Sequence, residues 1–338
     1  MQLTEHVSLL SLNTFGIEAK ARYFAEFASV AELLPLLAIK KERQLQLLVV
    51  GGGSNLLLTK DFDGLVLRNK IRGIDILKAD DEFVYVRVGA GEVWHDFVRW
   101  CIDENLAGLE NMSLIPGSVG AAPMQNIGAY GVELKEVFDA LEAIHIESGE
   151  MHRFNKEECK FGYRESIFKT SHKNQYVITA VHFKVRKQAA LNTSYGAIEE
   201  ELRRMQISNA GIKEVSDAVC NIRRSKLPDP LVTGNAGSFF KNPEVLKSFH
   251  DELKLRYPEL VAYPLANGNM KLAAGWLIEH CGWKGKALGR AGVHSKQALV
   301  LVNLGGANGN EVLQLSLQVK ASVREKFGVE LETEVNII

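Results

Sequence analysis

The sequence predicts an α+β fold with two or three compact parts. Stretches with a two-residue period, typical of strands, are interspersed without strict alternation among stretches that have helical spacing. The chain has 338 residues, which is enough for two domains or three. Apolar residues make up 46% and charged residues 24%, as in an ordinary globular protein.

The first half contains a helix and several strands. Ser29 and Glu32 have the spacing of a capping box, which predicts a helix running to about Arg43, although Pro35 weakens this prediction. The apolar residues between Trp94 and Ile102 lie on one helix face, and Gly108 is placed to end this helix soon afterwards. Short apolar or alternating runs predict strands at 45–50, 56–58, 64–67 and 84–88.

The second half continues the mixture. A hairpin is expected at 141–154 with its turn at Ser148-Gly149, followed by a strand at 177–185. A helix at 215–222 is stopped by Pro228, and a long helix at 310–327 precedes Gly328. The last segment, 329–338, is predicted to be a strand.

Composition and charge exclude several classes of protein. The net charge of −1 gives no basic field for nucleic acid. No apolar window reaches the roughly 18 residues of a membrane span, and a secretory signal is not expected at the N-terminus. The cysteines and histidines have no zinc-like spacing, so we expect no disulfide, no metal and a reduced cytoplasmic setting.

Two glycine-rich loops are candidates for ligand binding. Gly51–Asn55 follows a predicted strand and could bring backbone N–H groups to an anion, or could simply be a hairpin turn. It is neither a G-x-G-x-x-G motif nor a P-loop. The stretch 115–131 is long, rich in small residues and nearly uncharged. It indicates backbone packed against a flat or anionic group, or a buried connection between domains.

Six motifs follow one another along the chain. They are Asn13-Thr14-Phe15-Gly16, Gly51–Leu56, Ile115–Gly131, Tyr163-Arg164-Glu165-Ser166, Gly234–Pro243 and Glu332-Thr333-Glu334-Val335. Together they closely resemble UDP-N-acetylenolpyruvoylglucosamine reductases, the flavoenzymes of bacterial peptidoglycan precursor synthesis, in the longer subclass with a mobile tyrosine loop. The resemblance covers nearly the whole chain.

The resemblance implies a two-part FAD-binding domain of the vanillyl-alcohol-oxidase type and a C-terminal α+β substrate-binding domain. The two FAD-binding parts would be 1–69 and 70–190, and the substrate domain 191–328, with the strand 329–338 returning to the first part. Ala121 stands where the family often has serine, so a cofactor contact there would come from backbone. The implied FAD contacts are Gly51, Gly53, Ser54, Asn55, Leu56, Pro116, Gly117, Gly120, Ala121, Gly128 and Ile178.

The implied reaction is an NADPH-driven reduction. NADPH reduces FAD, and a hydride then reaches C3 of the enolpyruvyl ether of UDP-N-acetylglucosamine enolpyruvate, giving UDP-N-acetylmuramate. The accepting carbon is conjugated to a carboxylate, which is a poor electron sink. The site must therefore stabilise added negative charge and deliver a proton to C2. We expect the protein to work as a monomer.

Three residues fit these tasks by resemblance. Arg164 offers a permanent cation with a planar fork of donors for a carboxylate, unless it is only a surface partner of Glu165. Ser238 would protonate C2, since an enolate is a base strong enough to need no activated acid; otherwise it is an ordinary loop serine. Glu334 would help only if it holds a proton and donates a hydrogen bond. Thr333, where the family often has proline, could change how rigidly Glu334 is held, and Asn336 replaces a residue that is often basic.

Further residues match the family's substrate contacts. Lys226, at the end of the cationic stretch Arg223–Lys226, resembles its diphosphate-binding lysine, although cations at a helix end also favour the dipole. Asn242 and Gln297 match uridine and phosphate contacts, Tyr163 belongs to the site, and Tyr195 and Tyr263 resemble tyrosines that close over the substrate. Two alternatives remain: an oxidase of small alcohols on the same flavin fold, and a nucleotide-binding module without catalysis.

Overall fold

A computed structural model describes residues 3–338, and the chain divides into two compact units. The first unit contains the chain through Val7, residues 21–52 and residues 62–225. The second contains residues 8–20, 53–61 and 226–338. Helices and strands are mixed in both units, which confirms the predicted α+β class. Among the described residues, no helix combines the length and the apolar character needed to cross a lipid bilayer.

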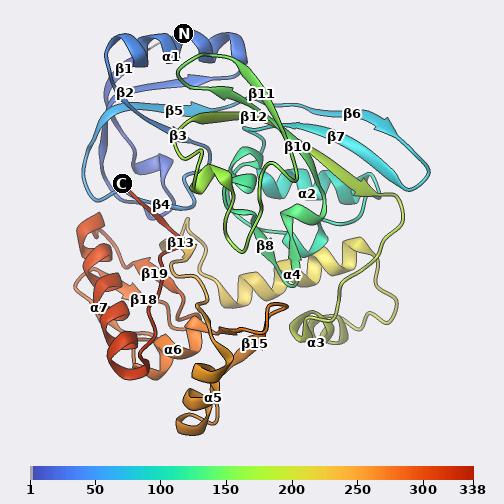
Figure 1. Ribbon diagram of the computed structural model, residues 1–338, viewed down its shortest axis with the longest axis vertical. Helices are drawn as coiled ribbons and strands as arrows, with labels where there is room; N and C mark the ends of the chain where they lie inside the picture. Colours follow the sequence, from blue (N-terminus) through green and yellow to red (C-terminus); the bar gives the residue numbers. More distant parts are fainter. Residues whose placement is uncertain (1–2) are drawn as a thin grey trace. The chain divides into compact units, whose positions relative to one another are not determined.

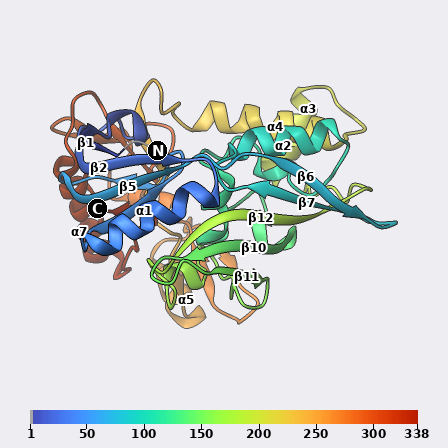
Figure 2. The ribbon, with the colours of Figure 1, turned by 90° about the horizontal axis from the view of Figure 1, so that it is seen from above.

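One layer of the first unit is a four-stranded sheet backed by α1 (Val30–Glu42). The strand order is β1 (Thr4–Ser8), β2 (Lys20–Phe27), β5 (Phe62–Asn69) and β3 (Gln46–Val50), and β5 runs parallel to both β2 and β3. Helix α1 lies along this sheet (Figure 2) and buries Leu33 and Leu36. The Ser29 side chain accepts the N–H of Glu32, so the predicted helix start is confirmed.

The other sheet of the first unit has five strands in the order β11-β10-β12-β7-β6 (Figure 1). Their bounds are β11 Met151–Asn155, β10 Phe138–His145, β12 Tyr176–Arg186, β7 Phe83–Gly89 and β6 Ile74–Ala79. Helix α2 (Trp94–Asp103) packs Trp94 and Phe97 against Phe183 of this sheet. Gly108 does not end α2, because the chain already leaves the helix at Glu104 and Asn105 takes the left-handed conformation instead.

Two further helices complete the first unit. Helices α3 (Gly196–Arg204) and α4 (Ile212–Lys226) share a small apolar core that includes Ile198, Val215 and Val219. The segment 128–133 forms the short strands β8 (Gly128–Ala129) and β9 (Val132–Glu133). The predicted hairpin is confirmed as β10 and β11, with Gly149 at φ +75° in its turn.

The second unit is built on a sheet of four strands in the order β13 (Gly234–Ser238), β19 (Val300–Asn303), β18 (Ala291–Val293) and β17 (Ala287–Leu288). A smaller sheet contains β14 (Glu244–Val245), β16 (Met270–Leu272) and β15 (Ala262–Pro264). Helices α5 (Lys247–Arg256), α6 (Ala274–His280) and α7 (Gly309–Phe327) complete it (Figure 1). Gly328, at φ +69°, ends α7 as predicted.

The predicted strand at 329–338 is largely wrong. Only β20 (Asn336–Ile337) forms a ladder, parallel to β4 (Leu56–Leu57). Before it, Thr333 makes a single bridge with Phe240. The apolar pattern of this segment therefore reflects burial of Val329, Leu331 and Val335 beside an irregular backbone.

Candidate active site

Ser238 ends β13, a strand of small residues that the sequence did not predict. The strand pairs with β19, with Ser238 opposite Val300, and an irregularity in the register lies between Asn235 and Ser238. Gly237 has φ +69°, a conformation that glycine adopts without strain. Phe239, the next residue, donates its N–H to the carbonyl of Leu299. The half-buried Ser238 thus sits on backbone that is held on both sides.

Two aromatic rings anchor the chain after Ser238. Phe239 and Phe240, the two residues after Ser238, are both fully buried. The Phe239 ring meets Phe240 at 5.1 Å between centroids and the buried Phe15 at 6.4 Å. Edge contacts of this kind contribute beyond the area they bury, so the hydroxyl is carried on a rigid support.

The N-terminal motif 13–16 holds β13 in place. The N–H of Asn235 donates to the Thr14 carbonyl at 2.9 Å, and Asn303 Nδ2 donates to the Phe15 carbonyl at 2.9 Å. A Cβ placed on Gly234 would lie 2.1 Å from the Phe15 carbonyl oxygen. Because backbone meets backbone here, only glycine fits at position 234.

Glu334 lies on the irregular segment beside Phe239, the residue after Ser238. Its N–H donates to the Phe239 carbonyl at 2.8 Å, and the N–H of Lys241 donates to the Glu332 carbonyl at 2.9 Å. Asn55 Nδ2 donates to the Glu334 carbonyl at 3.3 Å. The structure therefore brings together, within one unit, two of the three catalytic candidates and a residue of the first glycine-rich loop.

Two predicted substrate contacts converge on the start of α6. Asn242 Oδ1 accepts the N–H of Ala274 at 2.9 Å. Gln297 Oε1 would lie 3.2 Å from a Cβ on Gly275, and it accepts the N–H of Leu299 at 3.4 Å. Residues more than fifty positions apart in the sequence thus border the same turn of helix. Lys226, at the end of α4, and Tyr263, on β15, have exposed side chains in this unit.

Within the first unit, the two glycine-rich loops touch backbone to backbone. A Cβ on Gly51 would lie 2.0 Å from Ser118 Oγ, and one on Gly52 would lie 3.1 Å from the Cα of Gly117. Gly117 has φ +117° and its carbonyl accepts the N–H of Trp94. Glycine backbone packed this closely lets peptide groups approach a phosphate or a flat ring. The residues therefore fit the FAD that the sequence implies.

The rest of the second loop is equally close-packed. A Cβ on Gly120 would lie 2.5 Å from that of Ala90, while Ala121 is exposed. The buried Ile178 lies on β12, and its carbonyl accepts a hydrogen bond from Asn69 Nδ2 at 2.9 Å. A Cβ on Gly128 would lie 2.6 Å from the Val132 carbonyl. Pro116, another of the FAD contacts implied by the sequence, is exposed.

In the second unit, the first loop continues through residues 53–56. Gly53 has φ +61°, and a Cβ there would lie 1.9 Å from the Leu12 carbonyl, so position 53 requires glycine. Its carbonyl accepts the N–H of Thr14. Ser54 and Asn55 follow, and Leu56 opens β4 beside Asn336. The predicted cofactor residues are thus divided between the two units.

Arg164 is tied to the end of the second loop in the first unit. Its Nη2 donates to the Gly128 carbonyl at 2.8 Å, and its guanidinium lies 5.3 Å from the centre of the Tyr163 ring. Arg164 itself has φ +54°, a strained conformation for a residue with a side chain. The nearby Asn126, fully buried, donates to the Gly162 carbonyl and fixes the same stretch. The cation is therefore held in a defined place.

Tyr195 lies against the end of the second loop through contacts that the sequence analysis missed. Its ring meets that of Tyr130 edge-on, with centroids 5.4 Å apart. Asn111 Nδ2 donates to the carbonyls of Tyr130 at 2.9 Å and Asn192 at 2.8 Å, so one buried amide ties both segments. No periodicity marks Asn111, because a single buried amide has no pattern.

Arg223, the first residue of the cationic stretch Arg223–Lys226, makes a hydrogen bond to backbone. Its Nε donates to the Leu114 carbonyl at 3.2 Å. Burial lowers the pKa of the Arg223 guanidinium, against the effect of Tyr130 and Cys220. The cation therefore stabilises the path of the chain just before the second glycine-rich loop, whereas Arg224 and Lys226 are exposed.

The chain matches known proteins along its whole length. Residues 229–338 match the family model for the C-terminal domain of UDP-N-acetylenolpyruvoylglucosamine reductase, and residues 21–155 match an FAD binding domain. The chain is 52% identical to the UDP-N-acetylenolpyruvoylglucosamine reductase of Flavobacterium johnsoniae, over 100% of both chains. It is 50% identical to that of Pseudomonas aeruginosa, over 100% of this chain and 99% of the other. The crystal structure of the Thermus caldophilus reductase superposes with a TM-score of 0.70 at 26% identity, covering 100% of this chain and 99% of that one.

Proposed function

The chain belongs to the UDP-N-acetylenolpyruvoylglucosamine reductase family, and we propose from this premise that NADPH is its electron donor and Ser238 its proton donor. It is an FAD-dependent oxidoreductase that reduces UDP-N-acetylglucosamine enolpyruvate to UDP-N-acetylmuramate in peptidoglycan precursor synthesis. The FAD dependence and fold expected from the six motifs are confirmed. When bound, FAD supplies a hydride relay from the nicotinamide to C3 of the substrate.

The residues of this chain have to manage the charge that the hydride brings. As C3 gains the hydride, the electrons of the C2–C3 double bond move towards the carboxylate, which becomes a dianionic enolate. Arg164 stabilises this charge with a planar, permanently ionised fork of donors. Its hydrogen bond to Gly128 supports this role, because a positioned donor needs little rearrangement when the charge develops.

The observation that carries the proton-transfer step is the placement of Ser238. The hydroxyl transfers its proton to C2 as the enolate collapses, and the resulting alkoxide regains a proton from water. Phe239 donates its N–H to the Leu299 carbonyl and accepts the N–H of Glu334 at its own carbonyl, and these two hydrogen bonds fix the backbone next to the Ser238 hydroxyl. Glu334, in its protonated form, donates a hydrogen bond that stabilises the enolate. Its position on the neighbouring segment supports joint action with Ser238.

We assign the UDP part of the substrate to a lysine, polar side chains and tyrosines. Lys226 neutralises the diphosphate, and Asn242 and Gln297 contact uridine and phosphate at the start of α6. Tyr195 and Tyr263 close over the substrate. Tyr163 helps to orient Arg164, whose guanidinium lies over the tyrosine ring. We place the reaction in the cytoplasm and expect a monomer to carry it out.

The experiment separates the two half-reactions by anaerobic rapid mixing. Ser238→Ala is expected to accept electrons from NADPH at the normal rate, because the proton to C2 is not yet needed. Its reoxidation by the enolpyruvyl substrate should slow by about 10²–10⁴-fold. Ser322→Ala, on the exposed face of α7, is the matched control. Near-normal reoxidation of Ser238→Ala would remove this serine from the mechanism.

A further inference from the structure

The residue before the second glycine-rich loop is strained. Leu114 has φ +58°, in the left-handed region that residues with a side chain seldom adopt. It immediately precedes Ile115-Pro116-Gly117, so its conformation decides the direction in which this loop leaves the preceding turn. Such strain persists only where neighbouring groups hold it.

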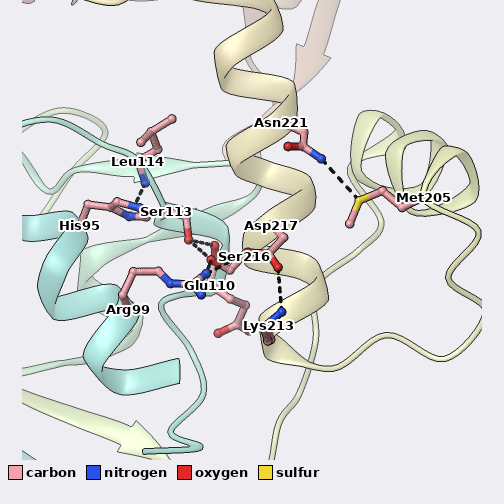
Figure 3. Close-up of polar contacts among 10 residues, drawn as sticks. All are labelled: His95, Arg99, Glu110, Ser113, Leu114, Met205, Lys213, Ser216, Asp217 and Asn221. Atoms are coloured by element: carbon pink, nitrogen blue, oxygen red, sulfur yellow. Dashed lines mark hydrogen bonds and ion pairs between the residues drawn. The ribbon is translucent and has the colours of Figure 1, made fainter. Parts of the chain in front are cut away.

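Two side chains hold the two polar groups of Leu114. Its N–H donates to His95 Nδ1 at 2.9 Å, and its carbonyl accepts from Arg223 Nε at 3.2 Å. Figure 3 shows His95, on α2, pointing at Leu114. A rotation of Leu114 out of the left-handed region would turn both groups away from their partners. The imidazole and the guanidinium therefore define one conformation.

The turn before Leu114 is fixed separately. Ser113 Oγ donates to the Glu110 carbonyl at 2.7 Å and shares a hydrogen bond of 2.8 Å with Ser216 Oγ of α4 (Figure 3). Arg99 of α2 donates to both Ser216 and Asp217. Because α2, the turn and α4 are joined without His95, loss of the His95 bond would free Leu114 while leaving its surroundings in place.

The bond to Leu114 requires neutral His95. A backbone N–H needs a lone pair on Nδ1, so the imidazole carries its proton on Nε2. The charged groups around it are Asp96 and Arg99 on its own helix and Arg223 and Arg224 on α4. Burial lowers the pKa of His95, the three arginines act in the same direction, and Asp96 opposes them. The surroundings thus favour the form that can accept.

We propose that neutral His95 is a positioning residue for the cofactor: it holds Leu114 left-handed and so sets the path of Ile115–Gly117 along FAD. The inference rests on the proposed placement of FAD against this loop. Protonation would put an N–H where the acceptor is needed and release Leu114. Because burial lowers the pKa of His95 where its Nδ1 accepts from Leu114, protons favour the released state. FAD affinity therefore falls as the pH drops below about 6.5, the ordinary value for histidine.

The test measures FAD dissociation constants of the apoprotein by flavin fluorescence between pH 5.5 and 8. His95→Phe removes the acceptor and should weaken binding about tenfold at pH 7.5. His95→Asn offers Oδ1 near the position of Nδ1 and does not titrate. It should bind within about threefold of wild type and lose the decline at low pH. In a Leu114→Gly background, where φ +58° costs little, His95→Phe should have a smaller effect.

Several outcomes would overturn the proposal. His95→Asn binding as weakly as His95→Phe would mean that ring packing, not the acceptor, matters. Equal pH profiles for wild type and His95→Asn would exclude protonation of His95. If His95→Phe does not fold, the pH dependence of FAD affinity in wild type and in His95→Asn still tests the proposal. A wild-type protein that binds no FAD would overturn the cofactor assignment as well. If wild type binds FAD and the His95 variants bind it with the same affinity, only this inference is overturned.

Discussion

The contact between the two glycine-rich loops can be tested by adding one methyl group at Gly51. In Gly51→Ala the new Cβ would lie 2.0 Å from Ser118 Oγ and 2.9 Å from Ser118 Cβ. Ordinary contacts lie at about 3.5–4.0 Å, so rotating the serine side chain relieves the first clash but not the second. Overpacking of this size costs about 1–3 kcal/mol. We expect the loops to separate and FAD affinity to fall by roughly tenfold.

A double-mutant cycle identifies the cause. Ser118→Gly removes both clashing side-chain atoms, and the backbone nitrogen of residue 118 lies 3.9 Å from the new Cβ, an ordinary contact. Gly51→Ala in this background should therefore cost little. Gly196→Ala, which has nothing within 4 Å, is the control. The assays are urea unfolding and flavin fluorescence titration. An equal loss with and without the Ser118 side chain would refute the reasoning.

Three further predictions concern the catalytic pair, the tyrosine loop and acid stability. Glu334→Gln, which can still donate a hydrogen bond, should keep most of kcat, while Glu334→Ala should lose about 10²–10³-fold; equal losses would exclude the protonated role. Tyr195→Phe should raise KM for the UDP substrate more than for NADPH, and equal changes would count against closure over the substrate. Hydrogen bonds from His182 and Arg87 lower the pKa of Glu142 to about 2. Since the unfolded value is higher, about 4.3, this carboxylate stabilises the fold above that pH by about 2–3 kcal/mol. This contribution is lost as the pH falls towards 2. In urea unfolding, Glu142→Gln should therefore have a lower free energy of unfolding than wild type at pH 7 and lose less of it on acidification. An unchanged dependence of the free energy of unfolding on pH would contradict this role of Glu142.

Regular elements were predictable where local chemistry decided them. The capping box at Ser29, the helix that ends at Gly328 and the turn at Gly149 each depend on residues within a few positions of one another. The segments 234–238 and 329–338 were not predictable, because their pairing depends on partners far away in the chain. Small residues also give no periodic signal, so β13 looks like a loop in the sequence.

The site was predictable as a set of motifs but not as a geometry. Ser238, Arg164 and Glu334 stand in recognisable motifs, and membership of the reductase family decides against both the alcohol oxidase and the non-catalytic binding module. The supporting residues gave no such signal. Asn111 donates to two backbone carbonyls and His95 accepts from one backbone N–H, and these hydrogen bonds form only when the loops are folded.

The most direct test follows the visible spectrum of the purified protein under anaerobic conditions. The protein should be yellow, lose its flavin absorbance when one equivalent of NADPH is added, and regain it when one equivalent of UDP-N-acetylglucosamine enolpyruvate follows. A simple alcohol should not affect the spectrum. A colourless protein that cannot take up FAD, or a bleached protein that the UDP substrate fails to reoxidise, would contradict the account.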